Sequence, residues 1–197
     1  MVRPVILALV VLLLASPLHQ DAPELSYSTD GQMNFPANYR EWVYLTSGLG
    51  MSYSATAPEH ARFDNVFVNP TAYKAFLATG TWPDKTVLVL EIRAAESKVS
   101  IDHHGQSQTT EVVGLEAHVR DEKLPGKWGF FEFDGRAPGK LVARPASCYT
   151  CHEAHAAVDT TFVQFYPTLI GVAKEKKTLS TGYLKEIPET AAEIPKH

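Results

Sequence analysis

The segment Cys148-Tyr149-Thr150-Cys151-His152 constrains this chain more than any other stretch. Two cysteines with two residues between them and a histidine directly after the second form the attachment sequence of a c-type haem. In such a site each thiol adds to one haem vinyl group and the imidazole binds the iron. The motif therefore predicts one covalent haem c held by Cys148 and Cys151, with His152 as the proximal iron ligand. The rest of the chain must then form a pocket around that iron.

Three other interpretations of the cysteines are open. A thioredoxin-like dithiol has the same spacing, but it sits where a strand meets a helix in a βαβ pattern, which this region lacks. A zinc site could use Cys148, Cys151, His152 and His155, although structural zinc usually takes its ligand pairs from two separated loops. A disulfide between the two cysteines suits an exported protein, but it leaves His152 without a role.

The first residues have the pattern of a secretory signal peptide. Arg3 supplies a positive end, residues 5–15 form an apolar run, and Ser16 and Pro17 follow. We expect residues 1–20 to be removed, with cleavage between Ala15 and Ala22. An uncleaved anchor is the alternative, but a run of about 11 residues is short of the roughly 20 that span a bilayer. Because c-type haem is attached outside the cytoplasmic membrane, the sequence predicts a periplasmic protein that is free of the membrane after cleavage.

Length and charge favour one domain without a nucleic-acid partner. The chain has 197 residues and a net charge of −4, and it shows no basic patch. After the signal peptide we expect an N-terminal leader at 21–34, a haem domain at 35–172 and a polar, mobile C-terminal tail at 173–197.

Periodicity predicts an α+β fold with a mainly antiparallel sheet and flanking helices. Two helices are expected, one over 37–45 and one that starts at Pro70 after Asn69 and stops at Gly80. Strands are expected at the following ranges: 66–68, 86–92, 112–119, 127–133 and 141–143. This count of strands differs from the helix-dominated pattern of ordinary small cytochromes c.

Alternation within the strands assigns side chains to faces. Leu88, Leu90 and Ile92 share one face of their strand, and Glu116 and His118 share one face of a later strand. One face of an antiparallel sheet is commonly solvated, and this pattern alone favours a wet face for the carboxylate and the imidazole.

The sequence resembles the cytochrome P-460 family and its relative, cytochrome c′-beta. The similarity extends from about Phe35 to Leu169. It rests on these segments: 35–43, 66–70 with Tyr73 and Gly80, 86–91, 114–117, 128–131, 148–152 and 159–167. The resemblance implies an antiparallel sheet with flanking helices, one covalent haem c near the C-terminal end, a histidine as proximal ligand and, commonly, a homodimer.

Leu90 decides between the two branches of that resemblance. Cytochrome P-460 proteins oxidise hydroxylamine with a haem that is further cross-linked through a lysine, whereas c′-beta proteins lack this bond and bind nitric oxide in an apolar pocket. Leu90 stands where the lysine is expected, and Lys85 lies in the preceding turn. The resemblance therefore places this chain closer to the c′-beta branch. Glu116 matches an acidic residue of the distal side and is the candidate proton acceptor.

Five apolar residues complete the predicted pocket. We expect the distal wall from Leu88, Leu90 and Phe67, and haem packing from Phe162 and Phe165.

The first functional hypothesis is a five-coordinate haem that captures or detoxifies nitric oxide or a related small nitrogen ligand. The second is oxidation of hydroxylamine or nitric oxide with Glu116 as base and a periplasmic redox partner as electron acceptor. The third is a six-coordinate electron carrier in which Met51, Met33 or His118 supplies the second axial ligand.

Overall fold

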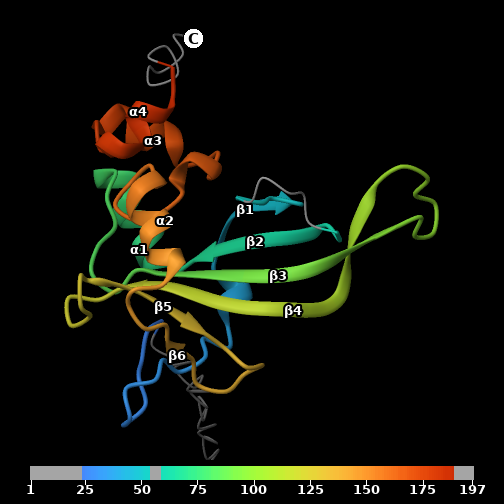
Figure 1. The fold of residues 1–197 in the computed structure, drawn as a ribbon, viewed down its shortest axis with the longest axis horizontal. Helices are drawn as coiled ribbons and strands as arrows, with labels where there is room; N and C mark the ends of the chain where they lie inside the picture. The colour runs from blue at the N-terminus through green and yellow to red at the C-terminus, as the bar shows by residue number, and fades with distance from the viewer. Residues whose placement is uncertain (1–23, 54–58, 189–197) are drawn as a thin grey trace, which may run out of the picture.

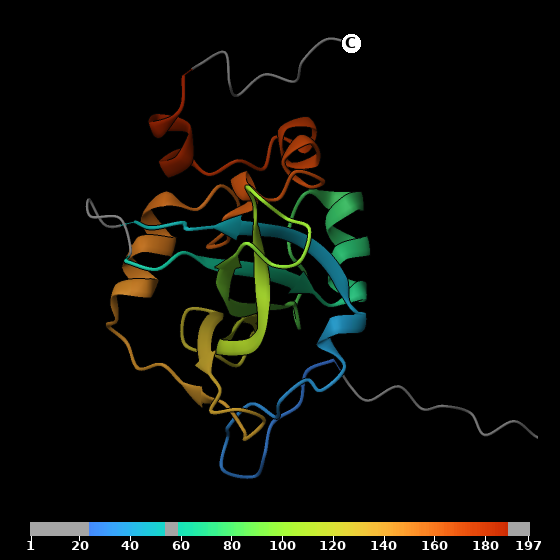
Figure 2. The same ribbon diagram turned by 90° about the vertical axis from the view of Figure 1, so that its right-hand side faces the viewer.

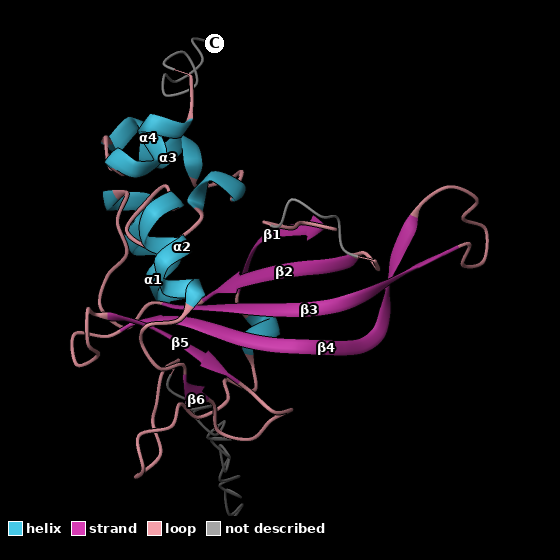
Figure 3. Ribbon diagram, in the orientation of Figure 1, coloured by secondary structure: helices cyan, strands magenta, loops and turns pink. Residues whose placement is uncertain are grey.

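The fold is a six-stranded antiparallel sheet whose strands follow one another in sequence order, with helices packed against one face and one end (Figure 1 and Figure 3). The computed structural model describes residues 24–53 and 59–188. The predicted α+β class is confirmed. The elements are η1 (Tyr39–Glu41), β1 (Val43–Leu49), β2 (Arg62–Val68), α1 (Pro70–Thr79), β3 (Val87–Ser97), β4 (Gln106–Arg120), β5 (Trp128–Glu132), β6 (Lys140–Leu141), α2 (Ser147–His155), η2 (Val163–Phe165), α3 (Ile170–Lys176) and α4 (Thr181–Glu186).

β3 and β4 form the spine of the sheet. They are its longest strands, and their hairpin extends past the ends of the neighbouring strands as an arm (Figure 1). β2 pairs with β3 so that Val66 lies opposite Leu90, and β3 pairs with β4 so that Leu90 lies opposite Glu116. Residues directly opposite one another in a sheet point to the same face. In this register Val66, Leu90 and Glu116, from three strands, therefore lie on one face of the sheet.

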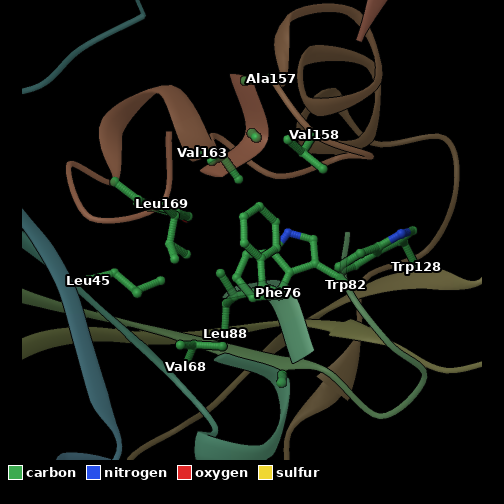
Figure 4. Packing of buried hydrophobic residues seen from close by; sticks show 13 residues of the cluster. Leu45, Val68, Phe76, Trp82, Leu88, Trp128, Ala157, Val158, Val163 and Leu169 are labelled. Atoms are coloured by element: carbon green, nitrogen blue, oxygen red, sulfur yellow. The ribbon is translucent and has the colours of Figure 1, made fainter. Parts of the chain in front are cut away.

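Each face of the sheet has its own hydrophobic cluster. The cluster under the helices is centred on Phe76 and Trp82, whose ring centroids lie 4.3 Å apart (Figure 4). The cluster on the opposite face includes Val87, Val89 and Phe131. Residues that alternate along β3 thus enter different clusters, as a period of two requires.

The helix predicted after Asn69 is confirmed as α1. Pro70 is its first residue, and Gly80 ends it in the left-handed region at a φ of 74°, where a residue without Cβ is least strained. The Asn69 side chain does not cap the helix. Its Oδ1 accepts a hydrogen bond from the Val87 N–H at 2.8 Å, and its amide donates to the Lys85 carbonyl at 3.2 Å. Asn69 therefore ties α1 to the start of β3.

The helix predicted over 37–45 is wrong. Only Tyr39–Glu41 forms a single 3-10 turn, and the backbone becomes extended at Trp42. Val43–Leu49 is β1, which pairs with β2 along the edge of the sheet. The hydrogen-bonding partner supplied by β2 outweighs the local helical pattern, which is the usual way in which tertiary context overrides propensity.

The mobile tail predicted from residue 173 is also wrong for the part that the structure describes. Residues up to Lys176 belong to α3, and α4 follows. The Thr178 hydroxyl donates to the Gly80 carbonyl at 2.7 Å, and the Ser180 hydroxyl donates to the Ala156 carbonyl at 2.6 Å. These bonds fasten the segment to the ends of α1 and α2. Residues 189–197 lie outside the described residues.

Residues 24–34 of the predicted N-terminal leader pack beside β6, against the cluster that includes Val87 and Phe131. Figure 2 shows them (blue) opposite α3 and α4 (red). Met33 bridges to Tyr27 and Gly139 and is fully buried. The predicted signal peptide, residues 1–20, lies outside the described residues. Within the parts of the chain that the structure describes, no helix is long and apolar enough to cross a bilayer.

Candidate haem site

α2 presents the two cysteines and the histidine of the attachment motif. Cys148 and Cys151 are three residues apart on this helix and therefore lie on one side of it. Both are half-buried, and neither is in a disulfide. Burial raises the pKa of the Cys148 thiol, with Glu116 and Glu132 adding to the effect against backbone hydrogen bonds that lower it. Cys148 is therefore a protonated thiol near neutral pH.

One backbone carbonyl orients His152. Its Nδ1 lies 2.7 Å from the Thr160 carbonyl oxygen. A carbonyl only accepts hydrogen bonds, so Nδ1 carries the proton and the lone pair is on Nε2. Burial also lowers the pKa of the imidazole, against the hydrogen bond to Thr160, which raises it. A neutral imidazole with a free Nε2 is the form that binds iron.

Aromatic rings surround His152. Its centroid lies 4.1 Å from that of Phe162, 4.7 Å from Phe130 and 5.0 Å from His118. Phe130 comes from β5 and His118 from β4, whereas Phe162 directly precedes η2. The ring of His152 is therefore held from the sheet and from the segment after its own helix.

A cavity of about 340 Å³ opens between this histidine and the sheet. Its volume falls within the range of roughly 300–1,000 Å³ typical of ligand and cofactor sites. Its lining is mostly apolar: Val66, Leu88, Leu90, Ile92, Ala117 and Phe130 come from the sheet, and Phe162, Phe165 and Tyr166 from the segment after the motif. Reduced thiols, an oriented imidazole and an apolar cavity beside it are the donor set and surroundings that a haem requires.

The cavity lining includes two of the three residues that were predicted to form a distal wall. Leu88 and Leu90 line the cavity, and so do Phe162 and Phe165. Phe67 does not. It lies on the opposite face of the sheet, where its ring contacts Tyr39 and Tyr44 at centroid distances of 5.6 and 5.8 Å. Phe67 follows Val66 in β2, and adjacent strand residues point to opposite faces.

Two carboxylates face the cavity. Burial raises the pKa of Glu116, and the negative charges of Glu132 and Asp64 raise it further. Asp64, from β2, also lines the cavity, and burial raises its pKa against the lowering effect of Arg62. Sequence reasoning missed Asp64 because the strand was expected to begin at Val66. The alternation of Asp64 with Val66 and Val68 is the signal that could have found it.

The expectation of a solvated face around His118 is wrong. His118 is buried, and its ring stacks on Phe130 with a centroid distance of 4.1 Å. Met51 lies at the exposed rim of the same cavity. Met33 belongs to the cluster on the other face of the sheet. Of the three candidate second axial ligands, only His118 and Met51 are therefore on the cavity side.

The structure argues against a zinc site and against a thioredoxin-like dithiol at the two cysteines. His155, the fourth ligand of a zinc site, pairs instead with Glu186 of α4. Over residues 24–53 and 59–188, no group of three or more His, Cys, Asp or Glu side chains could hold a metal ion. The sheet is antiparallel, whereas the dithiol interpretation needs a βαβ unit.

The family model for Cytochrome P460 matches residues 36–163. This chain belongs to the cytochrome P460 family. The matched residues run from η1 through the sheet and α2 to the start of η2, and they include His152, Glu116 and Leu90. Membership implies a haem cofactor and a role related to the metabolism of nitrogen compounds. A search of curated proteins found no match.

Proposed function

We propose that this protein carries one covalent haem c, attached through Cys148 and Cys151 and ligated by His152, and that it binds nitric oxide. The free thiols on one side of α2 and the unprotonated Nε2 of His152 support the attachment. Bound there, the haem supplies an iron that takes up a diatomic ligand and exchanges electrons.

The position of Leu90 is the observation that supports nitric oxide as the ligand. Leu90 faces the cavity at the position where the cross-linking lysine is expected, and it lies opposite Val66 on one side and Glu116 on the other. Together with Leu88 it makes this wall aliphatic. An aliphatic wall offers no hydrogen bonds to water or to charged anions, so it disfavours them relative to a small neutral diatomic.

We place the protein in the c′-beta branch and in the periplasm. The c′-beta branch fits Leu90, because a leucine has no nitrogen with which to form a further haem bond. Export to the periplasm, suggested by residues 1–20, fits haem attachment outside the cytoplasm. In this proposal the protein is a homodimer that captures or detoxifies nitric oxide and is re-reduced by a periplasmic redox partner.

The test is the absorption spectrum of the ferrous holoprotein before and after addition of nitric oxide, with hydroxylamine turnover assayed on the same sample. We expect a high-spin five-coordinate spectrum that changes stoichiometrically with nitric oxide, and negligible turnover. A six-coordinate low-spin spectrum that nitric oxide leaves unchanged would contradict the proposal and favour an electron carrier.

A second function, oxidation of hydroxylamine or nitric oxide, is favoured by the two half-buried carboxylates. Asp64 and Glu116 both line the cavity, and burial raises the pKa of each, which suits a group that takes up protons from a bound substrate near neutral pH. Rapid turnover with an artificial electron acceptor, lost in Glu116→Gln, would establish this function instead. The mass of the haem peptide gives an independent check, because a link beyond two thioethers would contradict the role given to Leu90.

A further inference from the structure

Thr160 contacts two imidazoles at once. Its carbonyl oxygen accepts from Nδ1 of His152 at 2.7 Å, and its hydroxyl oxygen lies 3.2 Å from Nε2 of His118. The two rings also meet edge to face, with centroids 5.0 Å apart and planes at 80°. His118 therefore reaches the proposed iron ligand both directly and through one shared residue.

The position of His118 is itself fixed by the sheet. Its ring stacks on Phe130 with planes at 11°, and its centroid lies 4.5 Å from that of Trp128. Both partners belong to β5, the strand next to β4. Because the ring is 8 % exposed and packed between aromatic neighbours, it has little freedom to leave the Thr160 hydroxyl.

The turn that contains Thr160 is held at several points. Asp159, directly before Thr160, has a φ of 52°, and the hydroxyl of Thr161, directly after Thr160, accepts a hydrogen bond from the Trp82 indole at 2.7 Å. Arg120 pairs with Asp159 at 3.4 Å and lies two residues after His118 on the same face of β4. β4 thus contacts two consecutive residues of the turn. Arg120 forms an ion pair with Asp159, and His118 contacts the hydroxyl of Thr160.

We infer that His118 is a positioning residue for the proximal ligand, acting through Thr160. Its hydrogen bond fixes the peptide group whose carbonyl accepts the Nδ1 proton of His152. A well-placed acceptor at Nδ1 makes the imidazole a stronger donor through Nε2 and fixes the rotation of its ring. The inference rests on the proposed haem attachment and holds whichever nitrogen compound the protein takes.

The test uses four variants of the holoprotein. His118→Phe keeps a ring against Phe130 but removes the bond to Thr160. Thr160→Val removes the hydroxyl and keeps the carbonyl, and Thr160→Ser, the matched control, keeps both. The fourth variant combines His118→Phe with Thr160→Val. The readouts are the iron–histidine stretching frequency of the ferrous protein by resonance Raman spectroscopy and the reduction potential. If His118 has only a structural role, the stretching frequency and the reduction potential stay unchanged in any variant that circular dichroism shows to be folded.

We expect His118→Phe and Thr160→Val to lower the stretching frequency and raise the reduction potential, because a weaker donor stabilises ferric iron less. The double variant should match the single ones, since both remove the same bond, and Thr160→Ser should match the natural protein. Unchanged values in both single variants, or additive changes in the double variant, would overturn the inference. So would conversion of a six-coordinate spectrum to a five-coordinate one in His118→Phe, because His118 would then be an iron ligand. If the mass of the haem peptide shows no haem joined to Cys148 and Cys151, the proposed attachment itself fails, and this inference fails with it.

Discussion

Glu91 keeps a buried charge because three donors converge on it. Its side chain is 4 % exposed, and it accepts from Arg40 Nε at 2.8 Å and from Arg93 Nε at 2.5 Å. The Tyr39 hydroxyl donates to the same carboxylate. Burial alone would raise the pKa of Glu91, but these bonds outweigh it and lower the pKa to about 2. This carboxylate lies on the face of the sheet away from the cavity and serves stability.

Stability should therefore fall in acid through Glu91. A carboxylate with a depressed pKa in the folded state stabilises the fold above its unfolded pKa of 4.5, and this contribution is lost as the pH falls from 4.5 towards 2. Glu91→Gln should lower the free energy of unfolding at pH 7 by about 2 kcal/mol, a value discounted because Arg40 is half exposed to water. Urea titrations from pH 7 to pH 2 should show the difference between the two proteins shrinking below pH 4.5. A difference that stays constant down to pH 2 would count against the assignment.

Leu90 offers a direct test of the apolar wall. Leu90→Lys places an ammonium group opposite Glu116 and brings water into the cavity. We expect nitric oxide affinity to fall by about tenfold or more, which corresponds to about 1.4 kcal/mol. Leu90→Met, which keeps the apolar character and approximate volume, should bind as the natural protein does. Stopped-flow association and dissociation rates give the affinities. Equal affinities for the two variants would contradict the claim that the apolar wall favours nitric oxide.

At the scale of elements, a helix or strand can be predicted from sequence where one short stretch contains all the residues that fix its conformation. α1 is predictable because Pro70 and Gly80 each mark an end through their own backbone restrictions. β1 is not, because its conformation depends on pairing with β2, which starts more than ten residues later. α3 and α4 were missed for a similar reason: both are short, and contacts with distant residues hold them, namely packing against the cluster around Phe76 and bonds to Gly80 and Ala156.

Ser180 should be the determinant of α4. Its hydroxyl accepts the Tyr183 N–H at 3.1 Å as an N-cap and donates to the Ala156 carbonyl. Ser180→Ala should cost about 1 kcal/mol of unfolding free energy, measured by urea denaturation. The neighbouring exposed Thr181, changed to Ser, serves as the control and should cost almost nothing. A loss confined to the control, or absent from both, would contradict the capping role.

At the scale of the whole molecule, one sheet is shared by two clusters and by the candidate haem site. Leu88 is buried in the cluster around Phe76 and also lines the cavity, while its neighbours Val87 and Val89 enter the cluster on the other face. Loss of packing in either cluster therefore reaches the site through β3. We expect the domain to unfold as one cooperative unit.

Phe76→Ala tests this coupling. Phe76 is fully buried, so the change should cost about 3–5 kcal/mol. Leu77→Ala, on the exposed side of the same helix, should cost about 0.5 kcal/mol or less. In urea the midpoints from far-ultraviolet circular dichroism and from haem absorbance should shift together. Separate midpoints for the two signals would show that the site unfolds independently of the cluster.

The sequence alone determined the attachment motif, the alternation of β3 and β4, the limits of α1 and the family. The first three depend on residues that are close in the chain, where covalent spacing and period fix the geometry. The family rests instead on segments that follow one another in order between residues 35 and 167. Alternation put Leu88 and Leu90 on one face of their strand, whereas the place of Glu116 beside the haem came from the family resemblance.

Only the tertiary structure decided which strands meet and what lies beside the histidine. It moved Phe67 to the other face, added Asp64 to the cavity wall and brought His118 and Thr160 against His152. These contacts join residues from separate elements, and they depend on strand register and on the path of a turn, which no local pattern specifies. The motif defines the proposed ligand of the iron, and the folded sheet defines the surroundings that tune it.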